Sequence, residues 1–449
     1  MPSPGTTTAI SAPTGLAPAL ERYFRLSENH STLRQELLAG LTTFMTMAYI
    51  VVVNPQILSQ AGMPAEGVVF ATCISAAIAT LVMGLYANYP IALAPGMSLN
   101  AYFTYSVCLG MHIPWRTALG VIFFSGTLFI LITLTRIREQ IVNGIPDCLK
   151  HSTAAGIGVF IAFVGMRNAK LVVASQATFL SLGNFSDREL QVACFGVLLT
   201  LVLIVRRVNG SILLGILGTT LFGIVRGIMH RPAQYLSIPH PSGTFLQLDL
   251  RGAMHLGLWE IIFAFLFVDL FDNIGTLMGV CAQAGFVKGG RIPRVGRVLL
   301  ADGVGTVVGS LTGTSTVTSY IESAAGVAAG ARTGLSNLVV AALFLVALFF
   351  APLAAAIPAF ATAPALILVG GLMMRSIADI EWTDLSEAFP AFLTIVAMPL
   401  TFSIATGLSF GVITYTVVKV AAGKHRQVSI VLWILTILFV VRDVYLAIG

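Results

Sequence analysis

Long apolar runs separated by short polar stretches dominate the chain from residue 37 onward. A bilayer crossing needs roughly 20 mostly apolar residues. Several runs are shorter than that, which predicts broken or tilted helices. A further apolar stretch, 428–446, is either an extra span or a helix at the membrane surface. The predicted spans are 37–53, 68–86, 93–110, 115–135, 152–168, 190–206, 211–228, 258–280, 297–311, 315–330, 334–356, 362–376, 388–404 and 405–421.

The composition supports a membrane protein. Of 449 residues, 57% are hydrophobic and 10% are charged, with a mean hydropathy of +0.91. Soluble domains carry about 25% charged residues, so this chain must face lipid. Its five cysteines have no zinc or redox spacing, so we expect no metal site and no disulfide framework. We also expect no cofactor, with protons as the coupling ion. The first twenty or so residues are rich in Pro, Thr, Ser, Gly and Ala, which predicts a disordered tail and not a cleaved signal.

The basic residues orient the spans. Cytoplasmic loops carry an excess of Lys and Arg, and a cytoplasmic N-terminus with about fourteen crossings puts most of them inside. The same placement beside apolar spans argues against nucleic-acid binding, despite a net charge of +6. We therefore expect a multi-pass protein of the cell membrane. The predicted inside residues are Arg22, Arg25, Arg34, Arg136, Arg138, Lys150, Arg206, Arg207, Lys288, Arg291, Arg294, Arg297, Arg332, Arg375, Lys419, Lys424 and Arg426.

The chain also repeats itself. FMTMAYIVVVNPQILSQAG (44–62) parallels FLFVDLFDNIGTLMGVCAQAG (265–285), and segment 145–169 parallels 357–378. Two halves of seven spans would be inserted upside down relative to each other, an arrangement typical of transporters with a site at the midplane. Chance similarity between apolar segments is the alternative.

Two corresponding segments are poorly suited to a continuous helix. ALAPGMSLNAYFTY (92–105) contains Pro95-Gly96, and GTSTVTSYIESAAGVAAG (313–330) opens with a β-branched, hydroxyl-rich run. Such residues favour extended backbone. Each segment is therefore predicted to be a short strand leading into a half-helix. Irregular backbone at membrane depth is tolerated where it lines a cavity; a proline kink with a small-residue packing face is the alternative.

Acidic side chains lie in the apolar segments. Asp269 and Asp272 are three residues apart and share a helix face with Thr276. Intramembrane carboxylates usually mark ion or substrate pathways, although a structural pair is the alternative. Asp302 is a third such carboxylate, flanked by glycines, and we favour a structural or proton-related role for it.

The second broken segment contains another acid. Ser319 and Glu322 form the S-x-x-E pattern of a capping box, so Glu322 caps the half-helix, faces the substrate, or does both. Asn100 is the polar side chain of the first broken segment. Carboxylates, an amide and half-helix amides suit a small planar solute with several N–H groups. Stacking faces could come from Tyr102, Phe103, Phe267, Phe271 and Tyr320.

Four motifs resemble the AzgA-like purine permeases of the nucleobase transporter superfamily. They are AGLTTFMTMAYIVVVNPQIL (39–58), APGMSLNAYF (94–103), VDLFDNIGTLMGV (268–280) and GTSTVTSYIESAAGVAAGARTGL (313–335). The resemblance runs from about residue 20 to the end of the apolar region. LNAYF and GTSTVT are closer to the adenine-type subgroup than to the guanine–hypoxanthine one.

This resemblance implies an all-α polytopic fold of about fourteen transmembrane segments in two inverted seven-helix repeats, with two short strands leading into half-helices. It implies a homodimer of chains that each have a core and a gate domain. The expected regions are a cytoplasmic tail (1–35), a first core region with spans 1–4 (36–135), a first gate region with spans 5–7 (136–257), a second core region with spans 8–11 (258–356), and a second gate region with spans 12–14 and the last apolar stretch (357–449).

The resemblance also implies uptake of adenine, guanine or hypoxanthine with protons. By motif, Asp269 and Glu322 bind the purine, Asn100 supports the site, and Asp272 affects binding or proton coupling. Thr276, Thr318 and Ser319 are candidate supporting residues. We hypothesise an elevator-like alternating-access cycle. The rivals are an anion transporter on the same fold, which would need a basic residue at the site, and an intramembrane enzyme, for which no nucleophile–base set is present.

Overall fold

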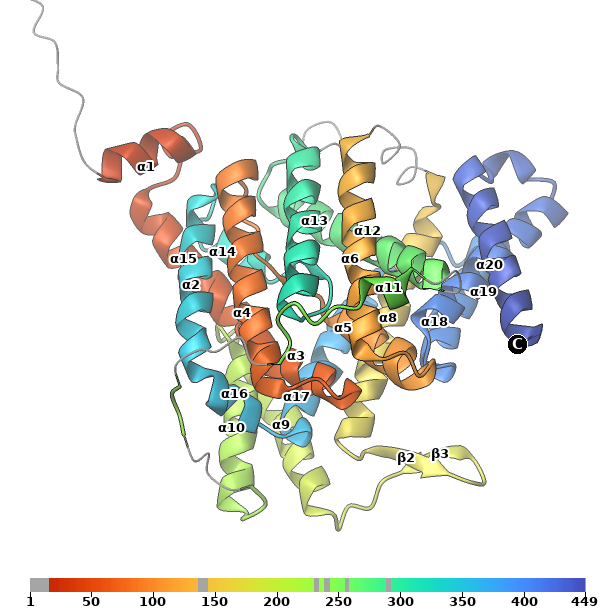
Figure 1. The fold of residues 1–449 in the computed structure, drawn as a ribbon, viewed down its shortest axis with the longest axis horizontal. Helices are drawn as coiled ribbons and strands as arrows, with labels where there is room; N and C mark the ends of the chain where they lie inside the picture. Colours follow the sequence, from red (N-terminus) through yellow and green to blue (C-terminus); the bar gives the residue numbers. More distant parts are fainter. Residues whose placement is uncertain are drawn as a thin grey trace, which may run out of the picture.

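The chain folds into a mostly helical bundle (Figure 1). The computed structural model describes residues 16–135, 144–229, 234–237, 243–254, 258–287 and 292–448. Within these ranges, ten helical segments are long and apolar enough to cross a bilayer. Two shorter apolar helices, α10 (Ser211–Val225) and α18 (Leu385–Leu400), and two strand–half-helix segments account for the remaining spans predicted up to residue 421.

The first half contains α1 (Leu16–Phe24), α2 (Leu33–Met47), α3 (Ile50–Leu58), η1 (Ser59–Ala61), α4 (Ala65–Val82), η2 (Met83–Ala87), β1 (Leu93–Pro95), α5 (Met97–Ala101), η3 (Tyr102–Gly110), α6 (Trp115–Leu134), α8 (Asp147–Asn168), β2 (Val172–Ser175), β3 (Phe179–Leu182), α9 (Arg188–Val205), α10 (Ser211–Val225) and α11 (Leu250–Ala253).

The second half contains α12 (Trp259–Gln283), α13 (Val295–Thr312), β4 (Val317–Ser319), α14 (Ser323–Ala328), α15 (Leu335–Ala347), η5 (Leu348–Phe350), α16 (Ala351–Ala356), α17 (Ala359–Met373), η6 (Met374–Asp379), α18 (Leu385–Leu400), α19 (Ile404–Ala421), η7 (His425–Gln427) and α20 (Ile430–Ile448).

The long helices pack in two groups. In the first group, α13 packs on α4 and α6, and α15 packs on α2 and α4. In the second group, α17 packs on α8 and α9, and α18 packs on α8 and α19. Segments from both halves of the sequence therefore alternate within each group, as expected for two interlocked repeats.

Small residues allow the closest of these contacts. A Cβ on Gly158 of α8 would lie 2.7 Å from the carbonyl oxygen of Gly370 on α17, and one on Gly370 would lie 2.3 Å from the carbonyl oxygen of Gly158. Such backbone approach is typical of membrane helices, which associate by close packing and not by burial from water.

The N-terminal region differs from the predicted tail. Helix α1 begins at Leu16, and Phe24 and Leu26 are buried against Leu335 of α15. The exposed Tyr23 donates a hydrogen bond of 2.9 Å to the carbonyl oxygen of Leu85. The apolar residues Leu16, Leu20 and Phe24 recur every four residues, which places them on one face of a helix. The run rich in Pro and Thr comes before this segment. Residues 1–15 lie outside the described residues.

The last apolar stretch forms helix α20, antiparallel to α19. Ser409 donates 2.5 Å to Asp443 Oδ2, and the hydroxyls of Thr416 and Thr436 are 2.7 Å apart. These two contacts, seven residues apart along each helix, hold α20 along the side of α19. The last apolar stretch is therefore a helix packed on the preceding one.

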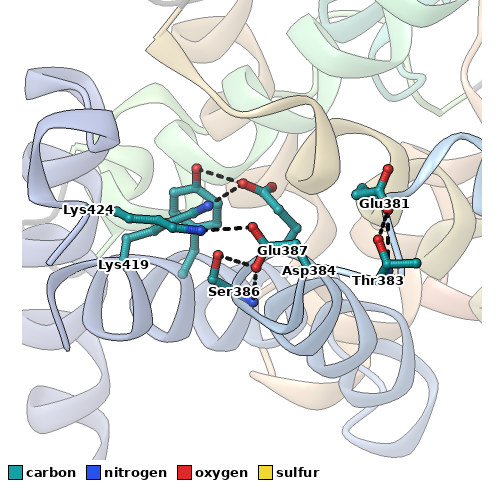
Figure 2. Close-up of polar contacts among 8 residues, drawn as sticks. Glu381, Thr383, Asp384, Ser386, Glu387, Lys419 and Lys424 are labelled. Atoms are coloured by element: carbon teal, nitrogen blue, oxygen red, sulfur yellow. Dashed lines mark hydrogen bonds and ion pairs between the residues drawn. The ribbon is translucent and has the colours of Figure 1, made fainter. Parts of the chain in front are cut away.

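At the other end of α19, two ion pairs hold it to the start of α18 (Figure 2). Lys419 is buried with its Nζ 2.5 Å from Glu387 Oε1, and Lys424 reaches Asp384 Oδ2 at 3.0 Å on the surface. Asp384 also caps α18 by accepting from the backbone N–H of Ser386. Hydrogen bonds from Ser386 and Lys424 hold the pKa of Asp384 well below its ordinary value.

Candidate substrate site

The two broken segments meet in one small antiparallel sheet. Strand β1 pairs with β4 in the register Leu93↔Ser319, Ala94↔Thr318 and Pro95↔Val317. Antiparallel pairing is what two inverted repeats require. The predicted strands are therefore confirmed, and the structure adds that they hydrogen-bond to each other.

Gly96 allows the two segments to approach this closely. A Cβ at this position would lie 2.6 Å from Thr318 Cγ2, a distance that side chains do not tolerate. The backbone N–H of Gly96 donates a hydrogen bond of 2.9 Å to the carbonyl oxygen of Thr316. The backbone N–H of Tyr320 donates a hydrogen bond of 3.0 Å to the carbonyl oxygen of Ala92. These bonds extend the pairing beyond both strands and satisfy polar backbone that lipid could not.

Helix α12 places its acids beside this sheet. Asp269 is buried and Asp272 is partly buried. Ser98, at the start of the first half-helix, donates 3.1 Å to Asp272 Oδ2. Helix α12, which carries both acids, packs on β4 and on α14, the short helix that follows Glu322. Thr276 lies one turn further along α12 and is partly buried.

Asn273 connects this helix to its neighbours. Its Nδ2 donates hydrogen bonds to Asp302 Oδ2 on α13, at 2.7 Å, and to Asp269 Oδ1, at 3.1 Å. Its Oδ1 accepts from the backbone N–H of Ser319 on β4 at 3.0 Å. The amide is fully buried. Sequence reasoning did not select Asn273, although its place directly after Asp272 and four residues after Asp269 was a usable signal.

Glu322 lies directly before α14, in the short turn that follows β4. Tyr49 donates a hydrogen bond of 2.5 Å to its Oε1. The capping-box interpretation is wrong: α14 begins at Ser323, Glu322 is its cap residue, and no side-chain cap hydrogen bond forms. Ser319 cannot act as the cap because β4 pairing places it four residues before the helix.

The remaining predicted residues lie in the same region. Ser315 donates to Oδ1 of the buried Asn100, while Asn100 Nδ2 has no hydrogen-bond partner among the described residues. The buried Ser319 Oγ also lacks a partner there. Thr318 is buried against Gly96. Two unused polar groups beside carboxylates provide the donors and acceptors that a polar solute could use.

The aromatic candidates have different surroundings. Tyr320 donates 2.6 Å to the carbonyl oxygen of Pro95, and the ring of Tyr102 is 4.9 Å from that of Phe265. Phe103 is buried. Phe267 lines a small apolar cavity with Leu149 of α8 and other side chains of α19 and α20. The side chain of Phe271 lies outside the described residues.

An inverted-repeat bundle with paired strands and carboxylates at its centre is the architecture of a membrane transporter. Residues 34–410 match the Permease family, and the chain belongs to this family. It is therefore a multi-pass membrane permease and not an enzyme.

Curated relatives cover nearly the whole chain. A putative permease of Methanocaldococcus jannaschii is 56% identical over 431 residues, 95% of this chain and 99% of the relative. Guanine/hypoxanthine permease PbuO of Bacillus subtilis is 44% identical over 427 residues, 93% of this chain and 99% of the relative. Adenine permease AdeP of Escherichia coli is 42% identical over 428 residues, 95% and 96% of the two chains.

Solved structures share the fold at low identity. The transmembrane domain of the cyanobacterial bicarbonate transporter BicA has a TM-score of 0.64 at 17% identity, covering 83% of this chain and 97% of that one. The murine solute carrier 26 family member A9 anion transporter has a TM-score of 0.62 at 11% identity, covering 93% and 74%. These likenesses concern the fold alone.

Proposed function

We propose that this permease takes up purine nucleobases together with protons. The observation that carries the proposal is the position of three acids around one strand pair. Asp272 bonds to Ser98 after β1, Asp269 is linked to β4 through Asn273, and Glu322 follows β4. Asn100 and Ser319 beside these strands have unused polar atoms. Relatives named as adenine and as guanine/hypoxanthine permeases support the substrate class. They do not separate adenine from the other purines.

A purine fits these groups by its hydrogen-bonding edges. Carboxylates accept from ring N–H and exocyclic amino groups, and an amide N–H donates to a ring nitrogen or carbonyl oxygen. We assign Asp269 and Glu322 as the main purine ligands and Asn100 as a supporting donor. Asp272, Thr276, Thr318 and Ser319 are assigned to proton coupling or support of the site.

A neutral purine gains nothing from the membrane potential by itself. Moving one positive charge down the potential supplies about 2.3 kcal/mol per 100 mV, so a carboxylate that takes up a proton with the purine links the two. We propose an elevator-like cycle in which the core (36–135 and 258–356) moves against the gate (136–257 and 357–449). We also propose that the N-terminus lies on the cytoplasmic side and that two copies of the chain form a homodimer.

Uptake of labelled adenine, guanine and hypoxanthine tests this function in cells that lack their own purine permeases. We expect Asp269→Asn and Glu322→Gln to lower uptake at least 10-fold at equal surface expression. The matched control is Glu28→Gln, at an exposed ion pair with Arg25. Normal uptake in both site variants would refute the assigned ligands.

Two further arms separate the mechanism from its rivals. Proton coupling predicts that a protonophore abolishes accumulation and that uptake falls as external pH rises. An anion transporter predicts competition by sulfate or bicarbonate, and the acidic side chains at this site argue against it. Accumulation that resists the protonophore would overturn the coupling without affecting the substrate assignment.

A further inference from the structure

A second set of charged residues lies at the end of the molecule that carries α1. Figure 1 shows α1 beside the bundle, near the end at which α4 finishes and α13 begins. The segment 85–89, which includes the end of η2 (Met83–Ala87), is the centre of this region. It receives contacts from α1 on one side and from the start of α13 on the other.

Two arginines from the start of α13 lie over the tyrosine rings of segment 85–89. Arg297 Cζ is 5.4 Å from the ring centroid of Tyr86, and Arg294 Cζ is 5.0 Å from that of Tyr89. Cation–π contact orients a guanidinium without neutralising its charge. The Tyr89 hydroxyl donates a hydrogen bond of 2.5 Å to the carbonyl oxygen of Pro293, which holds the ring in place.

The charges of these arginines are not balanced by nearby acids. Within the described part of the chain, neither Arg294 nor Arg297 forms an ion pair, and both are exposed. On the neighbouring α1 segment, Glu28 is paired with Arg25 at 3.6 Å, and Glu21 accepts 2.6 Å from Ser27. Among the described residues, neither of these acids is paired with Arg294 or Arg297.

Apolar surface lies directly beside the charge. Tyr23, Leu85 and Tyr86 are 58%, 44% and 49% exposed. They are contiguous because Tyr23 bonds to the backbone of Leu85. Asn88 anchors this segment. Its Nδ2 donates a hydrogen bond of 3.2 Å to the carbonyl oxygen of Phe24, and its Oδ1 accepts one of 2.7 Å from the backbone N–H of Gly334. Amphipathic aromatic side chains at a helix end are typical of the headgroup level of a bilayer.

We infer that this surface, formed by Tyr23, Leu85, Tyr86, Arg294 and Arg297, binds an anionic glycerophospholipid. The two guanidinium groups would take the headgroup phosphate, which their planar forks match in geometry. The exposed apolar side chains would lie along the upper acyl chain. The inference concerns a site separate from the carboxylates, and it does not depend on the purine assignment.

The test uses the full-length protein in nanodiscs of phosphatidylcholine containing a titrated fraction of phosphatidylglycerol. Bound phosphatidylglycerol is counted by native mass spectrometry after release. We expect Arg294→Gln/Arg297→Gln to weaken phosphatidylglycerol binding about 30-fold, since each basic residue near a membrane surface contributes about fivefold. The matched control is Arg206→Gln/Arg207→Gln, which removes the same charge from an exposed pair after α9.

Retention of phosphatidylglycerol in the double variant, or an equal loss in the control, would overturn the proposal. Displacement of the lipid by millimolar inorganic phosphate would also overturn it, since that indicates a site for a free anion. If the double variant does not purify as a folded protein, Arg297→Gln alone is measured, with an expected loss of about fivefold.

Discussion

Asn273 and Asp302 are joined by a hydrogen bond of 2.7 Å between the first two long helices of the second repeat. Asn54 makes the corresponding link in the first repeat, donating 2.7 Å to Thr72 on α4. Both asparagines also reach the segment around β4, through Thr314 and Ser319 respectively. The scaffold is thus similar in the two halves, but an acid in one half stands where the other has a threonine.

Replacing Asn273 with Ala should lower both stability and uptake. The change leaves Asp302 Oδ2 and the Ser319 N–H without their partner, and each unsatisfied buried group costs about 1–3 kcal/mol. We expect a lower melting temperature in detergent and a loss of purine uptake of at least 10-fold. Both are measured on protein matched for expression.

Asn54→Ala is the control for this change. It removes hydrogen bonds to Thr72 and Thr314, away from the acids, so we expect a similar drop in melting temperature with more uptake retained. Equal loss of uptake in the two variants would mean that Asn273 acts only through stability.

Gly96→Ala tests the close approach of the two strands. The new Cβ would meet Thr318 Cγ2 at 2.6 Å, and overpacking of this kind costs about 1–3 kcal/mol. We expect uptake to fall at least fivefold and to recover in Gly96→Ala/Thr318→Ser, which removes the clashing methyl group. Gly371→Ala, with no atom within 4 Å of its Cβ, should be neutral. Absence of rescue would show that Gly96 is needed for another reason.

The sequence was sufficient to predict the apolar spans, the two strands and the acidic residues that lie beside these strands. Apolar runs must cross lipid, and Pro95-Gly96 and the GTSTVT run interrupt helices by local chemistry. These features depend on residues close together in the chain. They could therefore be identified without knowing which helices touch.

The contacts between repeats could not be predicted in the same way. Tyr49 lies in the apolar run AYIVVVNP, and only the three-dimensional packing reveals that its hydroxyl meets Glu322. Ser319 matched a capping pattern, but pairing of β4 with β1 competed with that local preference and prevailed. The packing of α20 on α19 includes the contact between the hydroxyls of Thr416 and Thr436, which hydropathy does not report.

Tyr49→Phe isolates the hydroxyl that contacts Glu322. A hydrogen bond to a charged group contributes about 1.5–3 kcal/mol, so we expect Vmax/KM for adenine to fall about 10- to 100-fold. The melting temperature should fall only modestly, because Glu322 is partly exposed and the ring stays in place. Tyr235→Phe, at an exposed position outside both proposed sites, is the matched control. Unchanged kinetics would show that the orientation of Glu322 does not limit transport.

The two ion pairs of Figure 2 differ in burial, and this difference predicts different contributions to stability. Lys419 is 1% exposed, and removing one partner of a buried pair costs about 3–5 kcal/mol because the other charge is left unpaired. Lys419→Met should therefore lower the melting temperature strongly, and Lys419→Met/Glu387→Gln should recover some of the loss. Lys424 and Asp384 are 43% and 37% exposed, and such surface pairs contribute about 0–1 kcal/mol. Lys424→Met is therefore the control, and we expect it to have little effect on the melting temperature. If Lys419→Met and Lys424→Met destabilised the protein equally, the buried pair would not be the stronger link between α18 and α19.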